Sequence, residues 1–185
     1  MRIVGGRFKG RALAGPRSDA IRPTSDRLRE SLFNVLAHAY DDPVVDARVM
    51  DLFAGTGALG IEALSRGAAF ALFVDDGAQA RGLIRENVDA LGLGGVTRLF
   101  RRDATRLGAA DRFEPFDLVF CDPPYGRDLA GKALASAAAG GWLAPGALCV
   151  VEESADADLP CPAGFSEAER RTYGDTQVLF ARWGV

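Results

Sequence analysis

Short apolar runs alternate with helical patterns along most of this chain. The runs lie at residues 49–53, 70–74, 96–101, 116–121 and 147–152. Runs of this length bounded by glycine, proline and acidic residues are typical of buried strands that end in turns. Helical patterns extend to Arg66 after the first run and cover residues 78–91 and 129–139. Short apolar strands joined by such helices predict a parallel sheet covered on both faces.

The two ends of the chain depart from this alternation. Apolar residues recur at helical spacing over residues 24–40, which predicts an amphipathic helix. Strand-like runs at residues 167–173 and 176–183 are joined only by Gly174 and Asp175, the pattern of a β-hairpin. We therefore expect an α/β, Rossmann-like sheet, mostly parallel, with a C-terminal antiparallel hairpin and with a short N-terminal arm and helix before it.

A glycine-rich loop follows the first predicted strand. Gly55, Gly57 and Gly60 form G-x-G-x-x-G between a strand and a helix. Asp75, at the end of the next strand, is suitably placed to accept hydrogen bonds from two ribose hydroxyls. The pattern predicts a site for a nucleoside-bearing cofactor and suits NAD as well as S-adenosylmethionine.

Acidic residues stand at four consecutive strand ends: Asp51, Asp75, Asp103 and Asp122. In an open parallel sheet, ligands bind beyond the carboxyl ends of the strands. The four carboxylates are therefore expected to gather around one crevice. Asp103 has two interpretations, since it can cap the next turn or accept hydrogen bonds from an adenine amino group.

Asp122-Pro123-Pro124-Tyr125 directly follows the fourth predicted strand. Two prolines make the backbone rigid and remove two N–H donors, so the carbonyls here act only as acceptors. Together with the Asp122 carboxylate they can accept both hydrogens of an exocyclic amine and free its lone pair to attack. Tyr125 offers a face on which a base can stack. These residues predict methylation of an amino group on a planar ring.

The composition of the chain bears on its domain count, its cellular location and its charge. A chain of 185 residues fits one domain, and its three cysteines are too few and too scattered for a disulfide framework or a zinc site, so we expect no metal. We expect a cytoplasmic protein without a membrane segment, and a monomer. Residues 1–34 carry eight basic and three acidic side chains, a balance of +5, although the whole chain carries −3. This segment is either a polyanion-binding arm or a solvated tail.

The chain resembles the RsmD-type 16S rRNA (guanine-N2)-methyltransferase family over almost its whole length. The resemblance is carried by the segments 2–6 with Arg11, 22–34, 51–60, 122–125 and 173–176. The arginine-proline-threonine stretch at Arg22, Pro23 and Thr24 is specific to the family, whereas the glycine loop and the Asp-Pro-Pro-Tyr tetrad occur in many amino-methyltransferases. Similar proteins usually have a glutamate and a lysine-type residue at the second strand end, where this chain has Asp75 and Asp76.

The resemblance implies a class I S-adenosylmethionine-dependent methyltransferase sheet and a guanine of bacterial small-subunit rRNA as acceptor. It implies an RNA-contacting arm at residues 1–23 and a methyltransferase domain at residues 24–185. The tetrad Asp122, Pro123, Pro124 and Tyr125 is the expected catalytic set. The expected cofactor-binding residues are Arg22, Thr24, Asp51, Phe53, Ala54, Gly55, Thr56, Gly57, Gly60, Asp75, Asp76, Asp103 and Ala104. The expected RNA-binding residues are Arg2, Arg7, Lys9, Arg11 and Arg27.

The function expected from the sequence is methylation of the exocyclic N2 amine of a guanine in 16S rRNA, free or in a protein-bound assembly intermediate. The tetrad also permits a DNA adenine or cytosine, another RNA, or a protein glutamine as acceptor. An NAD-dependent dehydrogenase would share the glycine loop but gives the proline pair no purpose. A non-catalytic RNA-binding protein would use the basic arm but has little reason to keep four acids around one crevice.

Overall fold

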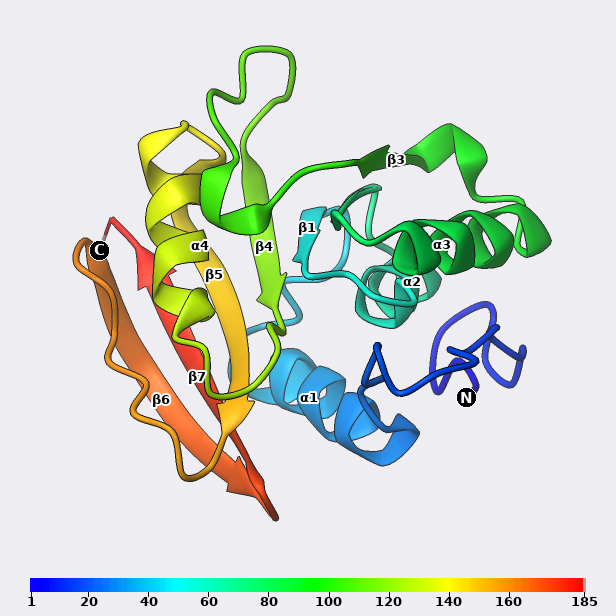
Figure 1. The fold of residues 1–185 in the computed structure, drawn as a ribbon, viewed down its shortest axis with the longest axis horizontal. Helices are drawn as coiled ribbons and strands as arrows, with labels where there is room; N and C mark the ends of the chain where they lie inside the picture. Colours follow the sequence, from blue (N-terminus) through cyan, green and yellow to red (C-terminus); the bar gives the residue numbers. More distant parts are fainter. Residues whose placement is uncertain (185) are drawn as a thin grey trace.

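Seven strands form one sheet in the order β3-β2-β1-β4-β5-β7-β6 in the computed structural model, which describes residues 1–184 (Figure 1). Strands β1 to β5 lie parallel to their neighbours among these five, whereas β7 runs antiparallel to both β5 and β6. This confirms the mostly parallel sheet with a C-terminal hairpin. The strands are β1 (Arg48–Leu52), β2 (Phe70–Val74), β3 (Thr97–Phe100), β4 (Phe116–Cys121), β5 (Leu143–Ser154), β6 (Phe165–Tyr173) and β7 (Thr176–Trp183).

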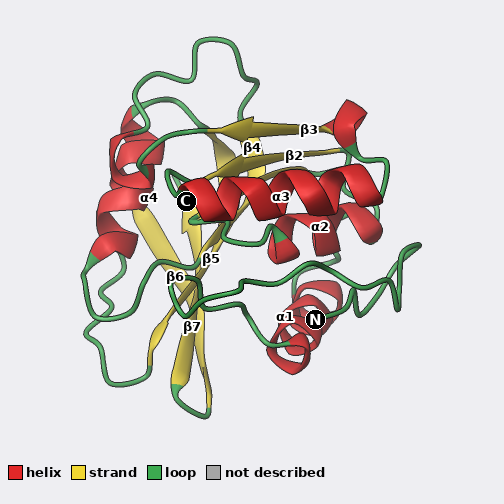
Figure 2. Ribbon diagram, turned by 45° about the vertical axis from the view of Figure 1, so that its right-hand side comes forward, coloured by secondary structure: helices red, strands yellow, loops and turns green. Residues whose placement is uncertain are grey.

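Helices cover both faces of the sheet because strand residues alternate between the faces. In β2, Ala71 and Phe73 pack in one core cluster and Leu72 and Val74 in the other. The first cluster lies under α1, α2 and α3, and the second under α4 (Figure 2). The helices are α1 (Asp26–Ala39), α2 (Ala58–Ser65), α3 (Ala78–Ala90) and α4 (Leu129–Ala139), with short 3₁₀ turns at Gly94–Val96 and Ala104–Arg106. Among the described residues, no helix combines the length and apolar composition that crossing a membrane requires.

The bounds of β4 and α4 coincide with those expected from the sequence, and the differences elsewhere have local causes. Strand β1 ends at Leu52 because Phe53 has a left-handed backbone, with φ of 57°. Strand β5 is longer than residues 147–152 because it has pairing partners at both ends. Leu143 pairs with Phe116 of β4, and Ser154 pairs with Thr176 of β7.

The segment of residues 1–23 begins as a tight hairpin that packs on the end of α2. The Ile3 amide donates to the Arg11 carbonyl at 3.0 Å, and the Ile3 side chain is buried in the core cluster under α1. Ser65 of α2 receives the hairpin, since its hydroxyl donates to the Gly5 carbonyl at 2.6 Å and its carbonyl accepts the Arg7 amide at 2.9 Å. Gly6 has φ of 74°, and a Cβ there would collide with the Ser65 carbonyl. The basic hairpin therefore has a defined place on the body.

A buried arginine joins this hairpin to the body. The Arg29 side chain is fully buried, and its Nε donates to Glu62 of α2 at 3.3 Å. Its other nitrogens donate to the carbonyls of Arg2 and Thr24, and Nη2 also contacts the Asp26 carboxylate at 2.9 Å. One guanidinium thus connects the hairpin, the segment before α1, and α2.

Glu62 completes the network from the other side. Its Oε2 also accepts the Val4 amide at 3.1 Å, and its Oε1 accepts from Arg66 Nε at 2.9 Å. Both Glu62 and Arg29 are shielded from water, so each depends on the other and on these hydrogen bonds.

Replacing Arg29 should destabilise the whole fold, because Glu62 would lose a buried partner. We expect Arg29→Met to lower the free energy of unfolding by about 3–5 kcal/mol, measured by urea denaturation. Glu30→Ala changes an exposed position of the same helix and should stay within about 0.5 kcal/mol of the wild type. An Arg29→Met variant as stable as Glu30→Ala would contradict the role of the network.

Candidate active site

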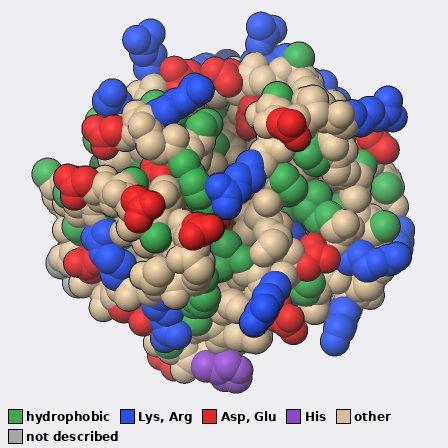
Figure 3. All heavy atoms as spheres, turned by 60° about the horizontal axis from the view of Figure 1, so that its bottom comes forward, with side chains coloured by type: hydrophobic (Ala, Val, Ile, Leu, Met, Phe, Trp, Pro, Cys, Tyr) green, Lys and Arg blue, Asp and Glu red, His purple; other side chains and the backbone are tan. Residues whose placement is uncertain are grey.

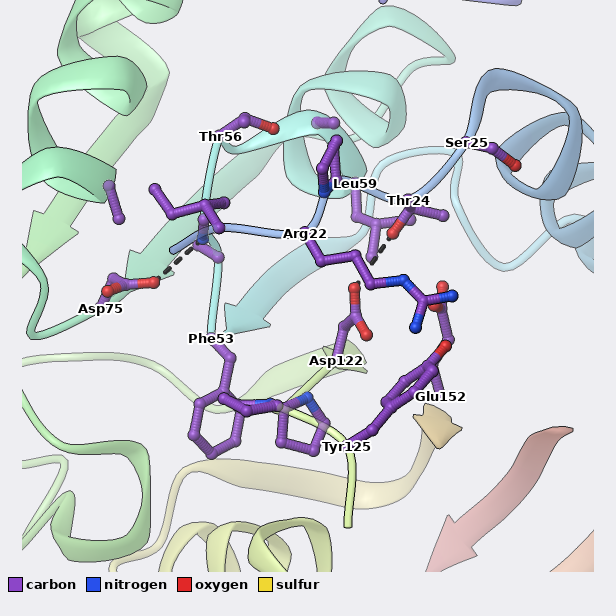
Figure 4. Close-up of a pocket in the computed structure, with 18 of the residues that line it drawn as sticks. Arg22, Thr24, Ser25, Phe53, Thr56, Leu59, Asp75, Asp122, Tyr125 and Glu152 are labelled. Carbon is purple, nitrogen blue, oxygen red and sulfur yellow. Dashed lines mark hydrogen bonds between the residues drawn. The ribbon is translucent and has the colours of Figure 1, made fainter. Parts of the chain in front are cut away.

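A large cavity opens at the carboxyl ends of the parallel strands, the position where open α/β sheets bind ligands (Figure 4). Its volume is about 1270 Å³, above the roughly 300–1,000 Å³ of usual small-molecule sites. The walls come from the loops after β1, β2 and β4, the end of β5, the turn between β6 and β7, and the segment that leads into α1. The cavity therefore has room for more than one ligand.

The glycine loop supplies one wall. Phe53, Ala54, Gly55 and Thr56 line the cavity, and Phe53 and Gly55 both have left-handed backbones. A left-handed phenylalanine is rare and is maintained only where the surrounding structure compensates its strain.

Gly57 and Gly60 lie behind this wall and do not line the cavity. Gly57, with φ of 80°, is the N-cap residue immediately before α2. A Cβ on Gly60 would lie 2.5 Å from a ring carbon of Phe73, so this glycine allows α2 to approach the sheet. The Gly60 amide donates to Asp51 Oδ2 at 3.0 Å, and burial raises the pKa of Asp51 well above its ordinary value. Asp51 reaches the cavity but mainly holds the start of α2 against β1.

Asp75 ties the loop after β2 to the glycine loop. Its Oδ2 accepts the Gly55 amide at 3.0 Å, and its Oδ1 accepts the Gly77 amide at 2.9 Å. The side chain is partly exposed to the cavity (Figure 4), and partial burial raises its pKa. Asp76 also lines the cavity and is exposed, but Asp75 is the acid that is held in place by both loops.

Asp103 and Ala104 are not brought to the cavity. Asp103 is exposed and caps a 3₁₀ turn, since its Oδ1 accepts the amide and the hydroxyl of Thr105 at 2.8 and 2.7 Å. These hydrogen bonds lower its pKa. Ala104 is buried in the core cluster under α4. Of the two interpretations of Asp103, the structure displays the helix cap.

The Asp-Pro-Pro-Tyr tetrad lies opposite the glycine loop, and neighbouring elements hold it from three sides. Asp122 Oδ2 accepts the Thr24 hydroxyl at 3.0 Å. The Tyr125 hydroxyl hydrogen-bonds that of Thr176 at 2.9 Å. After the tetrad, the Gly126 amide donates to Glu153 of β5 at 3.1 Å. All four tetrad residues line the same cavity as Gly55 and Asp75, which brings the two predicted motifs together.

Asp122 has a second carboxyl beside it that the sequence did not single out. Cys121 of β4 pairs with Val151 of β5, so the next residues along, Asp122 and Glu152, are neighbours (Figure 4). Burial raises the pKa of Asp122 to about 6, although the Thr24 hydrogen bond and the interactions with Glu152 and Arg22 oppose the rise. Burial and the Asp122 charge raise the pKa of Glu152 well above its ordinary value. Together, these two neighbouring acids therefore hold a proton more readily than an isolated, solvated carboxylate would.

Arg22 covers the aromatic ring of the tetrad. Its guanidinium carbon lies 4.3 Å from the centroid of the Tyr125 ring, a cation–π contact (Figure 4). The same positive charge lowers the pKa of Asp122. A base that stacked on this face of Tyr125 would have to displace the guanidinium.

The expected RNA-binding residues fall into two groups. Arg27 lines the cavity, whereas the four basic residues of the hairpin do not. Three of these four contact other parts of the protein: Arg2 donates to the Gly10 carbonyl, Arg11 donates to the Ala90 carbonyl at the end of α3, and the Arg7 guanidinium lies over the Phe8 ring. On the face that Figure 3 shows, Lys and Arg side chains alternate with Asp and Glu side chains rather than forming a large patch of one sign. On this face the positive charge is thus distributed in small groups.

Several lining residues were not expected from the sequence. Glu152 had no motif around it, and only the pairing register of β4 with β5 could have revealed it. The turn between β6 and β7 contributes its residues 173–176, a segment in which the sequence showed only a hairpin and a resemblance. The remaining unexpected lining residues are Asp19, Ala20, Ile21, Pro23, Ser25, Leu28, Ser31, Ala58, Leu59, Gly77, Ala78, Gln79, Ala80 and Arg127.

Comparison with known proteins adds an independent line of support. The family model described as conserved hypothetical protein 95 matches residues 1–182. Ribosomal RNA small subunit methyltransferase D of Escherichia coli is 41% identical over 176 residues, which cover 94% of this chain and 85% of that protein.

Solved structures agree with the fold. The Escherichia coli protein yhhF superposes with a TM-score of 0.83 at 35% identity, covering 99% of this chain and 97% of that one. Magnesium protoporphyrin IX methyltransferase from Synechocystis, solved with bound S-adenosylmethionine, gives a TM-score of 0.62 at 18% identity, covering 85% of this chain and 78% of that one. This last likeness concerns the fold alone, which is that of class I S-adenosylmethionine-dependent methyltransferases. The sequence and structural matches together make the chain a homologue of S-adenosylmethionine-dependent RNA methyltransferases, and it belongs to the RsmD family, whose model bears the description conserved hypothetical protein 95.

Proposed function

We propose that this protein methylates the exocyclic N2 amine of a guanine in small-subunit (16S) rRNA, with S-adenosylmethionine as the methyl donor. One observation carries the proposal: the Asp-Pro-Pro-Tyr tetrad and the glycine loop with Asp75 open into the same cavity. The relative that matches most of the chain at 41% identity is a small-subunit rRNA methyltransferase, which supports the choice of RNA.

The residues around the glycine loop fit the nucleoside half of the cofactor. Asp75 is a partly exposed carboxylate fixed by two backbone amides, and such a group can accept hydrogen bonds from ribose hydroxyls. The cofactor's nucleoside would lie along the wall formed by Phe53, Ala54, Gly55 and Thr56. Asp76 would lie at the edge of this part of the cavity. When bound, S-adenosylmethionine supplies a methyl group already activated by its sulfonium. The protein's own task is therefore to align the acceptor amine with that methyl group.

The tetrad would hold the acceptor amine. A guanine amino nitrogen is a poor nucleophile because its lone pair is delocalised into the ring. Asp122 and the donor-free backbone at Pro123 and Pro124 offer acceptors for both amine hydrogens, which favours a tetrahedral nitrogen with a free lone pair. After transfer, the methylated amine gives up one proton, to Asp122 or to water.

The target base would enter the cavity by leaving its stack, as enzymes that modify bases require. Tyr125 would stack against it once Arg22 has moved off the ring. Single-stranded or loop RNA lowers the cost of this step. The arm at residues 1–23, through Arg2, Arg7, Lys9 and Arg11, would contact the RNA backbone outside the cavity, and Arg27 would do so at its mouth, while residues 24–185 form the methyltransferase domain.

The decisive experiment is transfer of labelled methyl to small-subunit particles and to naked 16S rRNA from a strain that lacks this protein. We expect the label in N2-methylguanosine after nuclease digestion and chromatography. Label in an adenosine or cytidine, or transfer to DNA in preference to RNA, would refute the assigned acceptor. Binding of RNA without any transfer would favour a non-catalytic role.

Two substitutions should separate chemistry from cofactor binding. Asp122→Ala removes the acceptor of the amine and should lower kcat at least about 100-fold, with nearly unchanged affinity for S-adenosylmethionine. Asp75→Ala removes the ribose acceptor and loosens the glycine loop, so it should weaken cofactor binding about 10- to 100-fold. Isothermal titration calorimetry measures the affinities. Normal turnover of Asp122→Ala would exclude the role assigned to Asp122.

The ionisation of Asp122 should depend on Thr24. Thr24→Val removes a hydroxyl that stabilises the Asp122 carboxylate, so the pKa of Asp122 should rise by about one unit. Carbon-13 NMR of aspartate carboxyl carbons, followed from pH 4 to 9, measures the change. Thr105→Val is the matched control, since it removes a threonine hydroxyl from Asp103, outside the cavity, and should leave the Asp122 titration unchanged. An unaltered Asp122 titration in Thr24→Val would show that the hydrogen bond contributes nothing.

A further inference from the structure

Glu152 is a buried acid that the proposed chemistry leaves without a task. It lies near the end of β5, is 3% exposed, and lines the cavity beside the tetrad. Its Oε1 is buried and has no hydrogen-bond partner among the residues that the structure describes. A buried polar atom without a partner is rare in native proteins and calls for an explanation.

The surroundings of Glu152 leave it one free acceptor. Asp122 stands beside it on the adjacent strand, so the two carboxyl groups can share a hydrogen bond when one of them holds a proton. Thr24 donates its hydroxyl to Asp122, and its interaction with Glu152 partly opposes the rise in the pKa of Glu152. A protonated carboxyl group that gives its only hydrogen to Asp122 still has an oxygen with lone pairs to offer. Glu152 lines the cavity beside the tetrad, so a base held by the tetrad would lie next to this carboxyl group.

The edge of guanine matches this arrangement. Guanine carries its N2 amine directly beside N1–H, so it presents adjacent donors. Adenine and 2-aminopurine instead have a bare N1 with a lone pair. Adjacent strands lie about 4.7–4.9 Å apart, so Asp122 and Glu152 offer neighbouring acceptors. If Asp122 and the proline backbone take the amine hydrogens, the remaining donor, N1–H, falls to Glu152.

We propose that the Glu152 carboxyl group accepts the N1–H of the target guanine and so selects guanine against purines that lack this hydrogen. This inference rests on the function proposed above. A bare N1 would point its lone pair at an oxygen lone pair and leave both without a hydrogen. Glu152 could satisfy it only by withdrawing its own hydrogen from Asp122. Sites built to hydrogen-bond one group reject analogues that lack it far more strongly than apolar pockets do.

The test compares two acceptors that both carry the C2 amine. After the wild type has identified the methylated nucleotide, the same RNA is prepared with guanine or with 2-aminopurine at that position. Methyl transfer to each is measured as kcat/KM with wild type, Glu152→Leu and Glu152→Gln. The glutamine amide is the informative case, since its NH₂ can donate to Asp122 while its carbonyl accepts N1–H.

We expect the wild type to prefer guanine about 100-fold and Glu152→Gln to keep most of that preference. Glu152→Leu should lose most of it, chiefly through slower transfer to guanine. Glu153→Leu is the control on the same strand. Glu153 is equally buried and anchors the loop after the tetrad. Its replacement should therefore slow methyl transfer to guanine and to 2-aminopurine equally and leave the ratio of the two kcat/KM values unchanged.

The outcomes separate this inference from the proposed function. If the wild type transfers no methyl to guanine N2, the proposed function fails. If it does but shows no preference over 2-aminopurine, or if Glu152→Leu keeps the wild-type ratio, the inference about Glu152 is wrong. The inference is also wrong if Glu152→Gln loses the preference for guanine over 2-aminopurine as fully as Glu152→Leu does. Affinity for S-adenosylmethionine verifies that each variant is folded, and the wild-type ratio tests the inference even if Glu152→Leu does not fold.

Discussion

The buried guanidinium of Arg29 is the contact on which the arrangement of the site depends. It holds the carbonyls of Arg2 and Thr24 and pairs with Glu62 of α2. Thr24 is also bound to Asp122, because its side-chain hydroxyl donates to the Asp122 carboxylate. The basic hairpin and the candidate catalytic acid Asp122 are therefore connected through Arg29 and Thr24. Because an unpaired charge in the interior is costly, loss of Arg29 would leave Glu62 without its buried partner and would free the carbonyls of Arg2 and Thr24.

Carboxylates at adjacent strand ends set the electrostatics of the cavity. Asp51, Asp75 and Asp122 each carry a raised pKa, because each has lost water and because like charges lie nearby. Backbone amides compensate Asp51 and Asp75. For Asp122, the groups that oppose the rise in pKa are side chains: the Thr24 hydroxyl, the Arg22 guanidinium and the neighbouring acid Glu152. Asp51 and Asp75 are thus held by backbone amides, whereas Asp122, with a pKa of about 6, is held by side chains.

Much of the fold could be predicted because apolar periodicity determines it locally. Strand β4 and helix α4 have the bounds their patterns predict, and the hairpin follows from Gly174 and Asp175. What could not be predicted depends on register. Glu152 becomes a neighbour of Asp122 only through the pairing of β4 with β5. For Asp103 the sequence left two interpretations open, a turn cap and a contact to an adenine amino group, and only the structure shows that Thr105 binds its carboxylate.

The Arg22 guanidinium over the Tyr125 ring affects which molecules can bind in the cavity. Arg22 occupies one face of the ring as a base would, so the aromatic platform is already capped in the resting protein. A lone nucleoside must evict the guanidinium and gives it no counter-charge in return. A polynucleotide brings phosphates that can receive it as the base slides in. The cap would thus disfavour uncharged nucleosides relative to nucleic acid strands that carry phosphates.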